Sequence, residues 1–191
     1  MKPAFTRRVP PGDTHERAVC DRCAFVQYEN PRIVVGSVVR VPGGVPGEAA
    51  DASDGILMCR RAIEPRAGFW TLPAGYMEMG ETPGEAAARE AREEALADIA
   101  IDGTLAIYTV RRLGQVQIMH RATLRGSYGV GEESLDVRVF AWDAIPWDEL
   151  AFPTVVWALH HDRRGGGLHA NPEGDAEIDA AVARLRGWHS P

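Results

Sequence analysis

Alternation between apolar stretches and turn-forming residues divides the first half of the chain into candidate strands. Residues 32–41, RIVVGSVVRV, are rich in β-branched side chains and lie between two prolines, which is typical of a buried strand. The Gly- and Pro-containing residues 42–55 predict a long loop. Residues 56–61, ILMCRR, then predict the returning strand of a hairpin, and residues 69–75, FWTLPAG, predict a short strand or extended segment.

A helix is predicted to begin soon after these strands. Thr82 is a suitable N-cap residue, Pro83 fits the first helical position, and Glu85 lies three residues after Thr82, which completes a capping box. The helix is expected to run to about Leu96. Small side chains recur on one of its faces and would permit a close approach to a sheet, namely Ala87, Ala91 and Ala95.

The second half of the chain predicts further strands and two more helices. Strand patterns cover residues 105–110, 116–124 and 135–142, and residues 153–163 favour a helix that a run of glycines ends. Residues 176–187 predict an amphipathic tail helix, which we expect to be loosely docked. Strands and helices in this order predict an α/β sandwich in which the first helix packs on a mixed sheet.

These patterns divide the chain into three segments: an N-terminal extension of residues 1–31, a main domain of residues 32–163 and a C-terminal tail of residues 164–191. With 191 residues, 45% of them hydrophobic and 25% charged, the composition suits one globular domain with a modest extension. No apolar run approaches a membrane span, and the N-terminus has no apolar segment typical of a secretory signal. We therefore expect a cytoplasmic protein without a membrane partner.

The net charge of −6 bears on the kind of ligand. A general binder of nucleic acid usually carries a basic excess, so no nucleic-acid partner is expected. An acidic protein can still bind a small phosphate ester, either through local arginines or through metal ions that bridge its carboxylates to the phosphates.

The predicted helix after Thr82 carries glutamates at spacings that place three of them on one face. Glu90 and Glu94 lie four residues apart, and like charges at this spacing cost about 0.2–0.5 kcal/mol per pair. One interpretation is a merely solvated face, because glutamate is a good helix former. The other is chemical: Mg²⁺ typically takes one or two carboxylates together with substrate phosphates. Metal ions held in this way can activate water and stabilise a leaving oxygen, and thereby cleave a pyrophosphate bond.

Residues 75–97 resemble the signature of the Nudix hydrolases, G-x5-E-x7-R-E-U-x-E-E-x-G-U, in which U is a bulky aliphatic residue. Two departures concern the end of the helix and its apolar positions: Leu96 replaces the second glycine, and the smaller Ala91 and Ala97 stand at U positions. The glycine usually helps to end the helix, so its replacement bears on the local backbone path and removes no metal ligand. Six positions match in spacing: Gly75, Glu81, Arg89, Glu90, Glu93 and Glu94.

The resemblance extends over roughly residues 8–163. The segments CDRCAFVQYENPRIVVGSVV, CRRAIEPRAGFWTLPAGYMEMGE and EESLDVRVFAWDAIPWDELAFPT are similar to Nudix enzymes of bacteria and plant plastids that hydrolyse ADP-ribose and FAD. The resemblance implies the Nudix α/β/α sandwich with a mixed β-sheet, and hydrolysis of a nucleoside diphosphate derivative with Mg²⁺ or Mn²⁺. A nucleoside triphosphate hydrolase of the house-cleaning type and a non-catalytic nucleotide sensor remain as alternatives.

The same resemblance assigns roles to individual residues. Either Glu90 or Glu93 would assist water activation, and Arg89 would orient the glutamates through salt bridges. Nudix enzymes often recruit a further glutamate from a later loop, and Glu133, with Glu132 next, is either that ligand or an ordinary exposed acid. The expected metal ligands are Glu90, Glu93, Glu94, Glu81, the Gly75 carbonyl and Glu133.

Arginines and aromatic side chains are candidates for substrate binding. Arg32 and Arg60 could hold phosphates in a bidentate way, and Tyr28 and Tyr76 could stack on adenine or flavin. Arg60 and Arg61 point to opposite sides of a strand, so only one of them can face the site. Arg61 and Arg66 are further candidates for phosphate binding, and the other aromatic candidates, of which most are expected to be core or rim, are Phe69, Trp70 and Tyr108. By family similarity we also expect a homodimer whose N-terminal segments complete the partner's pocket.

Cys20 and Cys23 have the spacing of zinc ligands, but a structural zinc site needs four. Some relatives carry a second Cys-x-x-Cys upstream that completes a zinc ribbon, so residues 1–31 are a zinc-ribbon remnant or a dimerisation segment. His15 could supply a third ligand, while a metal-free, reduced half-ribbon is the expected state. Cys59 alternates with Leu57 and is expected in the core.

Overall fold

The computed structural model describes residues 4–43 and 55–188. Most of the loop predicted over residues 42–55 lies outside these ranges. The chain forms two compact units, Met1–Pro31 and Arg32–Pro191, which are described separately.

The first unit is a small antiparallel sheet in the order β1-β2-β3. Asp13, in the connection between β1 and β2, accepts hydrogen bonds from the backbone N–H groups of Thr14 and His15 and from Arg17 Nε. These bonds hold the pKa of Asp13 at about 2, the Arg17 bond being the largest cause. The strands are β1 (Phe5–Arg8), β2 (Arg17–Cys20) and β3 (Val26–Gln27).

The second unit contains a seven-stranded mixed sheet whose main order is β10-β5-β4-β9-β8, with β6 paired to β5 and β7 paired to β4. The pairing of β4 with β9 is parallel and the others are antiparallel. The strands are β4 (Arg32–Val41), β5 (Gly55–Arg61), β6 (Trp70–Thr71), β7 (Ala74–Tyr76), β8 (Asp98–Val110), β9 (Gln115–Arg125) and β10 (Ser134–Phe140).

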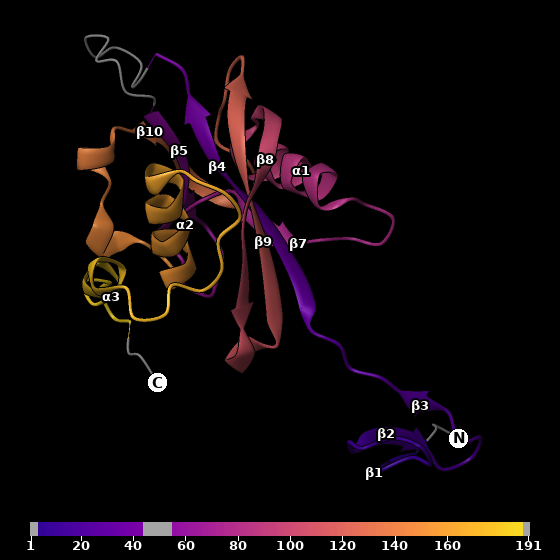
Figure 1. The fold of residues 1–191 in the computed structure, drawn as a ribbon. Coiled ribbons are helices and arrows are strands. Elements are labelled where there is room, and N and C mark those ends of the chain that lie inside the picture. The colour runs from indigo at the N-terminus through magenta and orange to yellow at the C-terminus, as the bar shows by residue number, and fades with distance from the viewer. Residues whose placement is uncertain (1–3, 44–54, 189–191) are drawn as a thin grey trace. The chain divides into compact units, whose positions relative to one another are not determined.

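Helices cover both faces of this sheet (Figure 1). Helix α1 (Pro83–Ala95) lies on one face, and α2 (Pro153–Arg164) and α3 (Ala176–Val182) lie on the other. The predicted α/β sandwich is therefore confirmed. Three short 3-10 helices lie in the connections, at Arg111–Leu113, Trp142–Ala144 and Trp147–Glu149. No helix within residues 4–43 and 55–188 is long and apolar enough to cross a membrane.

The apolar core is divided between the two faces of the sheet. The cluster on the α2 side includes Met58, Tyr108 and Leu159, and the cluster on the α1 side includes Leu57 and Cys59. Cys59 is thus a core residue, as the alternating pattern predicts.

The expectation of a loosely docked tail helix is wrong. Ile178 of α3 is fully buried in the cluster on the α2 side, and Leu185 beyond the helix joins the same cluster. The helix itself ends at Val182, five residues before the predicted boundary. Val182 is partly buried against this cluster as well, so the tail is an integral part of the second unit.

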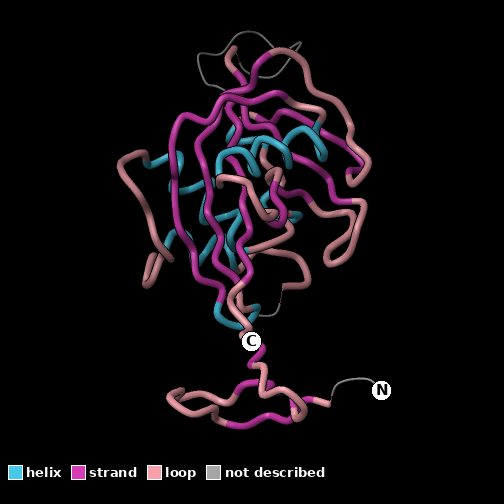
Figure 2. The backbone as a smooth tube through the Cα atoms, turned by 90° about the vertical axis from the view of Figure 1, so that its right-hand side faces the viewer, coloured by secondary structure: helices cyan, strands magenta, loops and turns pink. Residues whose placement is uncertain are grey.

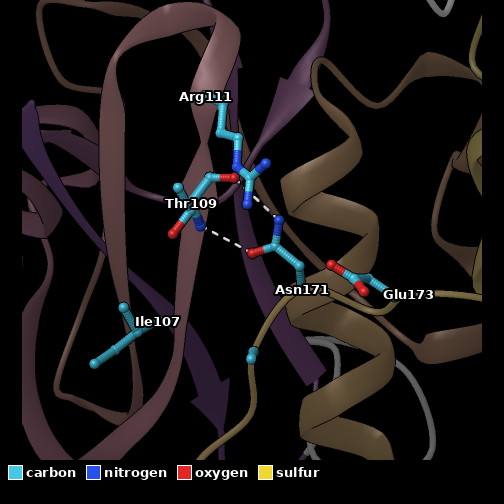
Figure 3. A pocket seen from close by; sticks show the side chains of 6 residues that line it. Ile107, Thr109, Arg111, Asn171 and Glu173 are labelled. Carbon is cyan, nitrogen blue, oxygen red and sulfur yellow. Dashed lines mark hydrogen bonds between the residues drawn. The ribbon is translucent and has the colours of Figure 1, made fainter.

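Strand β8 forms an edge of the sheet, and a segment after α2 covers it. The N–H of Ile107 donates to the His169 carbonyl, and the N–H of His169 donates to the Leu105 carbonyl. The Asn171 side chain bonds both backbone groups of Thr109, as seen beside the open pocket in Figure 3. This cover pairs backbone groups that an edge strand would otherwise expose. In Figure 2 the long strands of this sheet run between a helix on the near side and helices on the far side.

Candidate active site

Helix α1 begins at the predicted residue because its capping box forms. The N–H of Glu85 donates to Thr82 Oγ1 over 3.3 Å, and the N–H of Thr82 donates to Glu85 Oε2 over 2.8 Å, with Pro83 at the start. Two N–H groups that a helix start leaves unpaired are thereby satisfied. The cap fixes the first turn and, with it, the direction of the acidic positions that follow.

The helix ends at Leu96, the position at which the family signature has glycine. Leu96 adopts a left-handed conformation with φ 47° and ψ 29°, and its N–H bonds the Ala91 and Arg92 carbonyls. A left-handed conformation costs an L-residue about 1–2 kcal/mol. The Leu96 side chain stays 58% exposed. The glycine replacement therefore leaves the path of the helix end intact.

Alanines on the inner face of α1 bring its carboxylates close to strand β7. Glu90 and Glu94 are buried, and Gly75 lies directly beneath Glu90. A Cβ atom built on Gly75 would stand 2.3 Å from Glu90 Oε2 and 2.5 Å from Glu90 Oε1. Only a glycine at this position leaves room for the carboxylate. The inner face consists of Ala86, Ala87, Ala91 and Ala95, all fully buried.

The salt bridges predicted for Arg89 are present and join both ends of the signature. Arg89 Nε and Nη2 donate to the two carboxylate oxygens of Glu81, over 2.7 and 3.1 Å. Arg89 Nη1 donates to Glu90 Oε1 over 2.7 Å and to Glu93 Oε2 over 3.0 Å, and Nη2 also bonds the Tyr76 carbonyl. The hydrogen bond to Glu81 is the largest cause that raises the pKa of Arg89. A single guanidinium thus holds three of the expected ligands.

Glu94 is a buried carboxylate whose negative charge few neighbouring groups offset. It is 5% exposed, and Oε2 accepts one hydrogen bond, from the Ala74 N–H over 3.0 Å. Burial raises its pKa to about 8, although the Ala74 N–H and the positive charge of Arg61 act in the opposite direction. Burial is also the main cause that raises the pKa of Glu90. Within the described residues no Arg, Lys or His lies within 4 Å of Glu94, so this buried acid lacks a counter-ion.

The loop between β9 and β10 brings Glu133 beside these acids. The N–H of Gly129 donates to the Ala95 carbonyl over 2.8 Å, and the N–H of Gly131 donates to the Glu94 carbonyl over 3.1 Å. The loop therefore satisfies carbonyls that a helix end leaves unpaired. The negative charge of Glu133 contributes to raising the pKa values of Glu90 and Glu94, so Glu133 is near enough to influence both acids.

This group of carboxylates fits a hard divalent cation. Oxygen donors are the ligands that Mg²⁺ prefers, and a buried acid without a counter-ion such as Glu94 is stabilised by one. No three His, Cys, Asp or Glu side chains in the part of the chain that the structure describes are arranged as a finished ion site. Arg89 instead holds Glu90 and Glu93 in its own hydrogen bonds. The residues thus supply the right donors, with Arg89 as their present partner.

Two of the expected substrate-binding residues lie together. The guanidinium of Arg32 stacks over the Tyr76 ring, 5.1 Å from its centroid, and Gln115 Nε2 donates to the Tyr76 hydroxyl. Tyr28 belongs to the first unit, where the Arg17 guanidinium lies over its ring. Trp70 and Tyr108 are buried in the core, as expected.

Arg60 and Arg61 leave β5 in different directions, as strand alternation predicts. Arg60 follows Met58 toward the α2 side, and its Nε donates to the Gly68 carbonyl over 2.9 Å. Arg61 Nε bonds the Pro65 carbonyl, and the charge of Arg61 is the one that reaches Glu94. Arg61 is therefore the arginine nearer to the acidic group, whereas the sequence analysis places Arg60 among the substrate-binding residues.

Gly131 shapes the site although it lies outside the signature of residues 75–97. A Cβ atom on this residue would stand 1.8 Å from the Glu93 carbonyl oxygen, so the loop can reach α1 only through a glycine. The available signal is the pair of glycines at 129 and 131 directly before Glu132 and Glu133. A loop that must pass close to a helix backbone favours such glycines.

The first unit lacks the ligands of a zinc site. Cys20 is buried and Cys23 is exposed, and neither forms a set of three with His15 or another potential ligand in the described ranges. Cys59 lies in the core of the second unit. Two thiols do not satisfy the four-coordinate geometry of structural zinc.

Replacing Gly75 by Ala tests whether the position of Glu90 matters. The added methyl group meets the end of a flexible carboxylate, so Glu90 is expected to move while the fold persists. We expect activity to fall about tenfold, or roughly 1.4 kcal/mol in the activation free energy. Steady-state kinetics and a thermal melt measure the two effects. A variant with unchanged kcat would show that the contact between β7 and Glu90 is dispensable.

Comparison with known proteins gives one consistent result. The NUDIX domain family matches residues 44–158, and the Nudix N-terminal family, a zinc ribbon, matches residues 3–29. A crystal structure of a NUDIX hydrolase from Nitrosomonas europaea is 36% identical, with a TM-score of 0.74, and the match covers 87% of this chain and 93% of that one. The comparison with curated proteins gives no match.

Two more distant structures share the fold. An ADP-ribose pyrophosphatase from Streptococcus suis is 16% identical with a TM-score of 0.54, over 74% of this chain and all of that one. The NUDIX domain of NrtR from Shewanella oneidensis, complexed with ADP ribose, is 16% identical with a TM-score of 0.55, over 72% of this chain and 89% of that one. The signature on α1, the sandwich fold and these matches agree: the chain belongs to the Nudix hydrolase family.

Proposed function

We propose that this Nudix hydrolase cleaves the pyrophosphate bond of nucleoside diphosphate derivatives such as ADP-ribose or FAD, with Mg²⁺ or Mn²⁺, and releases AMP. The observation that carries this proposal is the acidic group on α1, in which Glu94 is buried without a counter-ion beside Glu90. Water would attack one phosphorus, which gives AMP and ribose 5-phosphate from ADP-ribose, or AMP and FMN from FAD.

The glutamates of the acidic group would have separate roles in this reaction. Glu90, Glu93, Glu94 and Glu133 would hold the metal ions, with Glu81 and the Gly75 carbonyl as further donors. When bound, the ions supply charge neutralisation and an activated water. Glu93 has a side chain that is 56% exposed, so it can reach a bound substrate, and it or Glu90 would take a proton from the water.

Arg89 has a positioning role in this scheme. Because it donates to Glu81, Glu90 and Glu93 together, it keeps like charges close before any ion enters. Glu90 and Glu93 would hold an ion, and the two bonds to Glu81 would keep Arg89 in place beside them. Arg89 therefore acts on the ligands and has no contact with the reacting atoms in this proposal.

The substrate class rests on a second set of residues. The Arg32–Tyr76 pair offers a guanidinium that suits a phosphate and a ring that suits a base, and it lies at the strand that carries Gly75. Two structures of the same fold carry ADP-ribose in their names, which supports this class without fixing the second group. Arg61 would assist from the side of Glu94.

A substrate panel tests the proposal. ADP-ribose, FAD, NADH and nucleoside triphosphates are each incubated with the full chain and Mg²⁺ or Mn²⁺, and AMP and phosphate release are measured. AMP from ADP-ribose or FAD, with kcat/KM at least tenfold above that for triphosphates, is the expected result. Preference for triphosphates would replace the proposal by the house-cleaning activity. Tight binding without turnover of any substrate would indicate a sensor.

The oligomeric state is part of the same proposal. We expect a homodimer in which the N-terminal unit contributes to the partner's substrate pocket, and light scattering of the full chain measures its mass. The small first unit exposes Phe5, Phe25 and Tyr28, side chains that an interface would cover. A monomer at the concentrations of the assay would contradict this arrangement.

A further inference from the structure

The first unit presents a disagreement between its family and its residues. Its sequence matches a zinc-ribbon family over residues 3–29, yet it supplies two sulfur ligands where structural zinc takes four. No third potential ligand stands beside them within the described residues. Cys20 and Cys23 therefore do not complete the zinc site that the family implies. The chemistry available to the pair is that of two thiols.

The backbone brings the two thiols together in a tight turn. Cys20 ends strand β2, and residues 21–23 form the turn. The N–H of Ala24 donates to the Cys20 carbonyl over 2.9 Å, and the N–H of Cys20 donates to the Phe25 carbonyl over 2.8 Å. Ala24 closes the turn in a left-handed conformation, with φ 58°. Two residues three apart in a turn have Cα atoms less than about 7 Å apart, which is within the range of a disulfide.

The two cysteines differ in their exposure to solvent. The backbone N–H groups of Arg22 and Cys23 are the main causes that lower the pKa of the Cys20 thiol. Cys20 is 3% exposed, whereas Cys23 is exposed to solvent. An external reagent can thus reach Cys23 first, and the turn keeps Cys20 within disulfide range of Cys23.

We propose that Cys20 and Cys23 form a dithiol that is reversibly oxidised to an intrachain disulfide by a small disulfide such as oxidised glutathione. Cys23 loses its proton and attacks one sulfur of the small disulfide, which gives a mixed disulfide and one released thiol. The Cys20 thiolate then attacks the Cys23 sulfur and expels the second thiol. The protein loses two protons and two electrons, and the small disulfide takes them up to become two thiols.

Oxidation would have a structural consequence for the first unit. Among the described residues of this unit the buried side chains are few, namely Pro10, Val19 and Cys20. Units below about 40 residues usually need a disulfide, a metal or a partner for stability. A bond between Cys20 and Cys23 fixes the turn that ends β2, which partly replaces the crosslink that zinc provides in a complete ribbon.

The test uses the full chain, first reduced and then equilibrated in buffers of defined glutathione ratio. Free thiols are blocked with iodoacetamide, and intact mass and peptide mapping identify the products. The expected result is a loss of two hydrogens that maps to the peptide joining Cys20 and Cys23. Cys59 is the internal control, because it is buried in β5 and should react only after unfolding.

Two variants separate the steps. In Cys20→Ser the second attack is impossible, so the first intermediate should accumulate as one glutathione adduct on Cys23. In Cys23→Ser the exposed nucleophile is lost, and at least tenfold less modification is expected, because Cys20 is buried. Equal modification of both variants would contradict the assigned order of attack.

Zinc is measured in the same samples by elemental analysis after addition of one equivalent and dialysis. Retention of one zinc per two chains, with both thiols protected from iodoacetamide, would overturn the proposal in favour of a site shared between two copies. A pair that stays reduced at every glutathione ratio would overturn it as well. Because no step depends on the acidic group of α1, failure of either proposal leaves the other standing.

Discussion

Replacing Glu93 and Glu94 together by Gln is expected to lower kcat by about a thousandfold or more, which corresponds to roughly 4 kcal/mol in the activation free energy. The change removes two negative charges from the group that would hold the metal ions and leaves the volume of both side chains unchanged. Glu94 supplies a buried oxygen and Glu93 an exposed one, so both the inner and the outer part of the ligand set are weakened.

The fold of this double variant should persist. The amide oxygen of Gln at position 94 can still accept the Ala74 N–H, and a neutral side chain costs less to bury than a carboxylate without a counter-ion. We therefore expect a melting temperature equal to or above that of the unchanged protein. Loss of activity together with a stable fold separates a role in metal binding from a role in folding.

A control variant matches the change in charge. Glu173 and Asp179 are both exposed, and their replacement by Gln and Asn alters the net charge by the same amount away from the acidic group. This control should keep its activity. Calorimetric titration of Mg²⁺ or Mn²⁺ completes the experiment: full activity or unchanged metal binding in the Glu93→Gln/Glu94→Gln variant would contradict the assigned role of these acids.

The parts of the site that depend on short-range sequence were predictable. The capping box at Thr82 and Glu85 fixes where α1 begins, and a helix of known start determines which acids share a face. Arg89, four residues before Glu93, lies within reach of it for the same reason. These relations depend only on positions close together in the chain. The structure contains both the predicted cap and the salt bridge between Arg89 and Glu93.

Contacts between distant segments were harder to predict. The first half of β8, from Asp98 to Thr104, mixes polar and apolar residues and contains bulges, so its pattern is weaker than that of residues 105–110. Which of Arg60 and Arg61 lies nearer to Glu94 depends on the register of β5 under α1, which local patterns do not set. The loosely docked tail was a wrong expectation because Ile178 and Leu185 join a cluster that also contains Met58 and Tyr108, which are remote in sequence.

Contacts from Arg89 and from the Ala74 N–H limit the repulsion within the acidic group. Arg89 links three carboxylates, and the burial of Glu94 is offset only in part by the Ala74 N–H. A cation that binds to such a group would offset the negative charge that these contacts leave uncompensated. The carboxylates of this group repel one another, and they therefore favour a cation that bridges them to a phosphate.

Replacing Gly131 by Ala is expected to destabilise the protein by about 2–3 kcal/mol, a cost typical of inserting a group where no space exists. The new Cβ atom would stand 1.8 Å from the Glu93 carbonyl oxygen and 2.8 Å from the carbonyl carbons of Glu93 and Glu94. These atoms belong to the backbone of α1, so they cannot move aside as a side chain does. The loop must shift, and the hydrogen bond from the Gly131 N–H to the Glu94 carbonyl is lost.

Activity should fall with stability, because the same loop carries Glu133 beside the acidic group. Urea unfolding measures the first effect and steady-state kinetics the second. Gly84→Ala in α1 is the matched control: its Cβ atom would meet Ile101 at an ordinary 3.7 Å, and alanine in a helix stabilises by about 0.5–1 kcal/mol relative to glycine. If Gly131→Ala were as stable and active as the unchanged protein, the loop could not lie against α1, and Glu133 would lose the placement on which its role as a ligand depends.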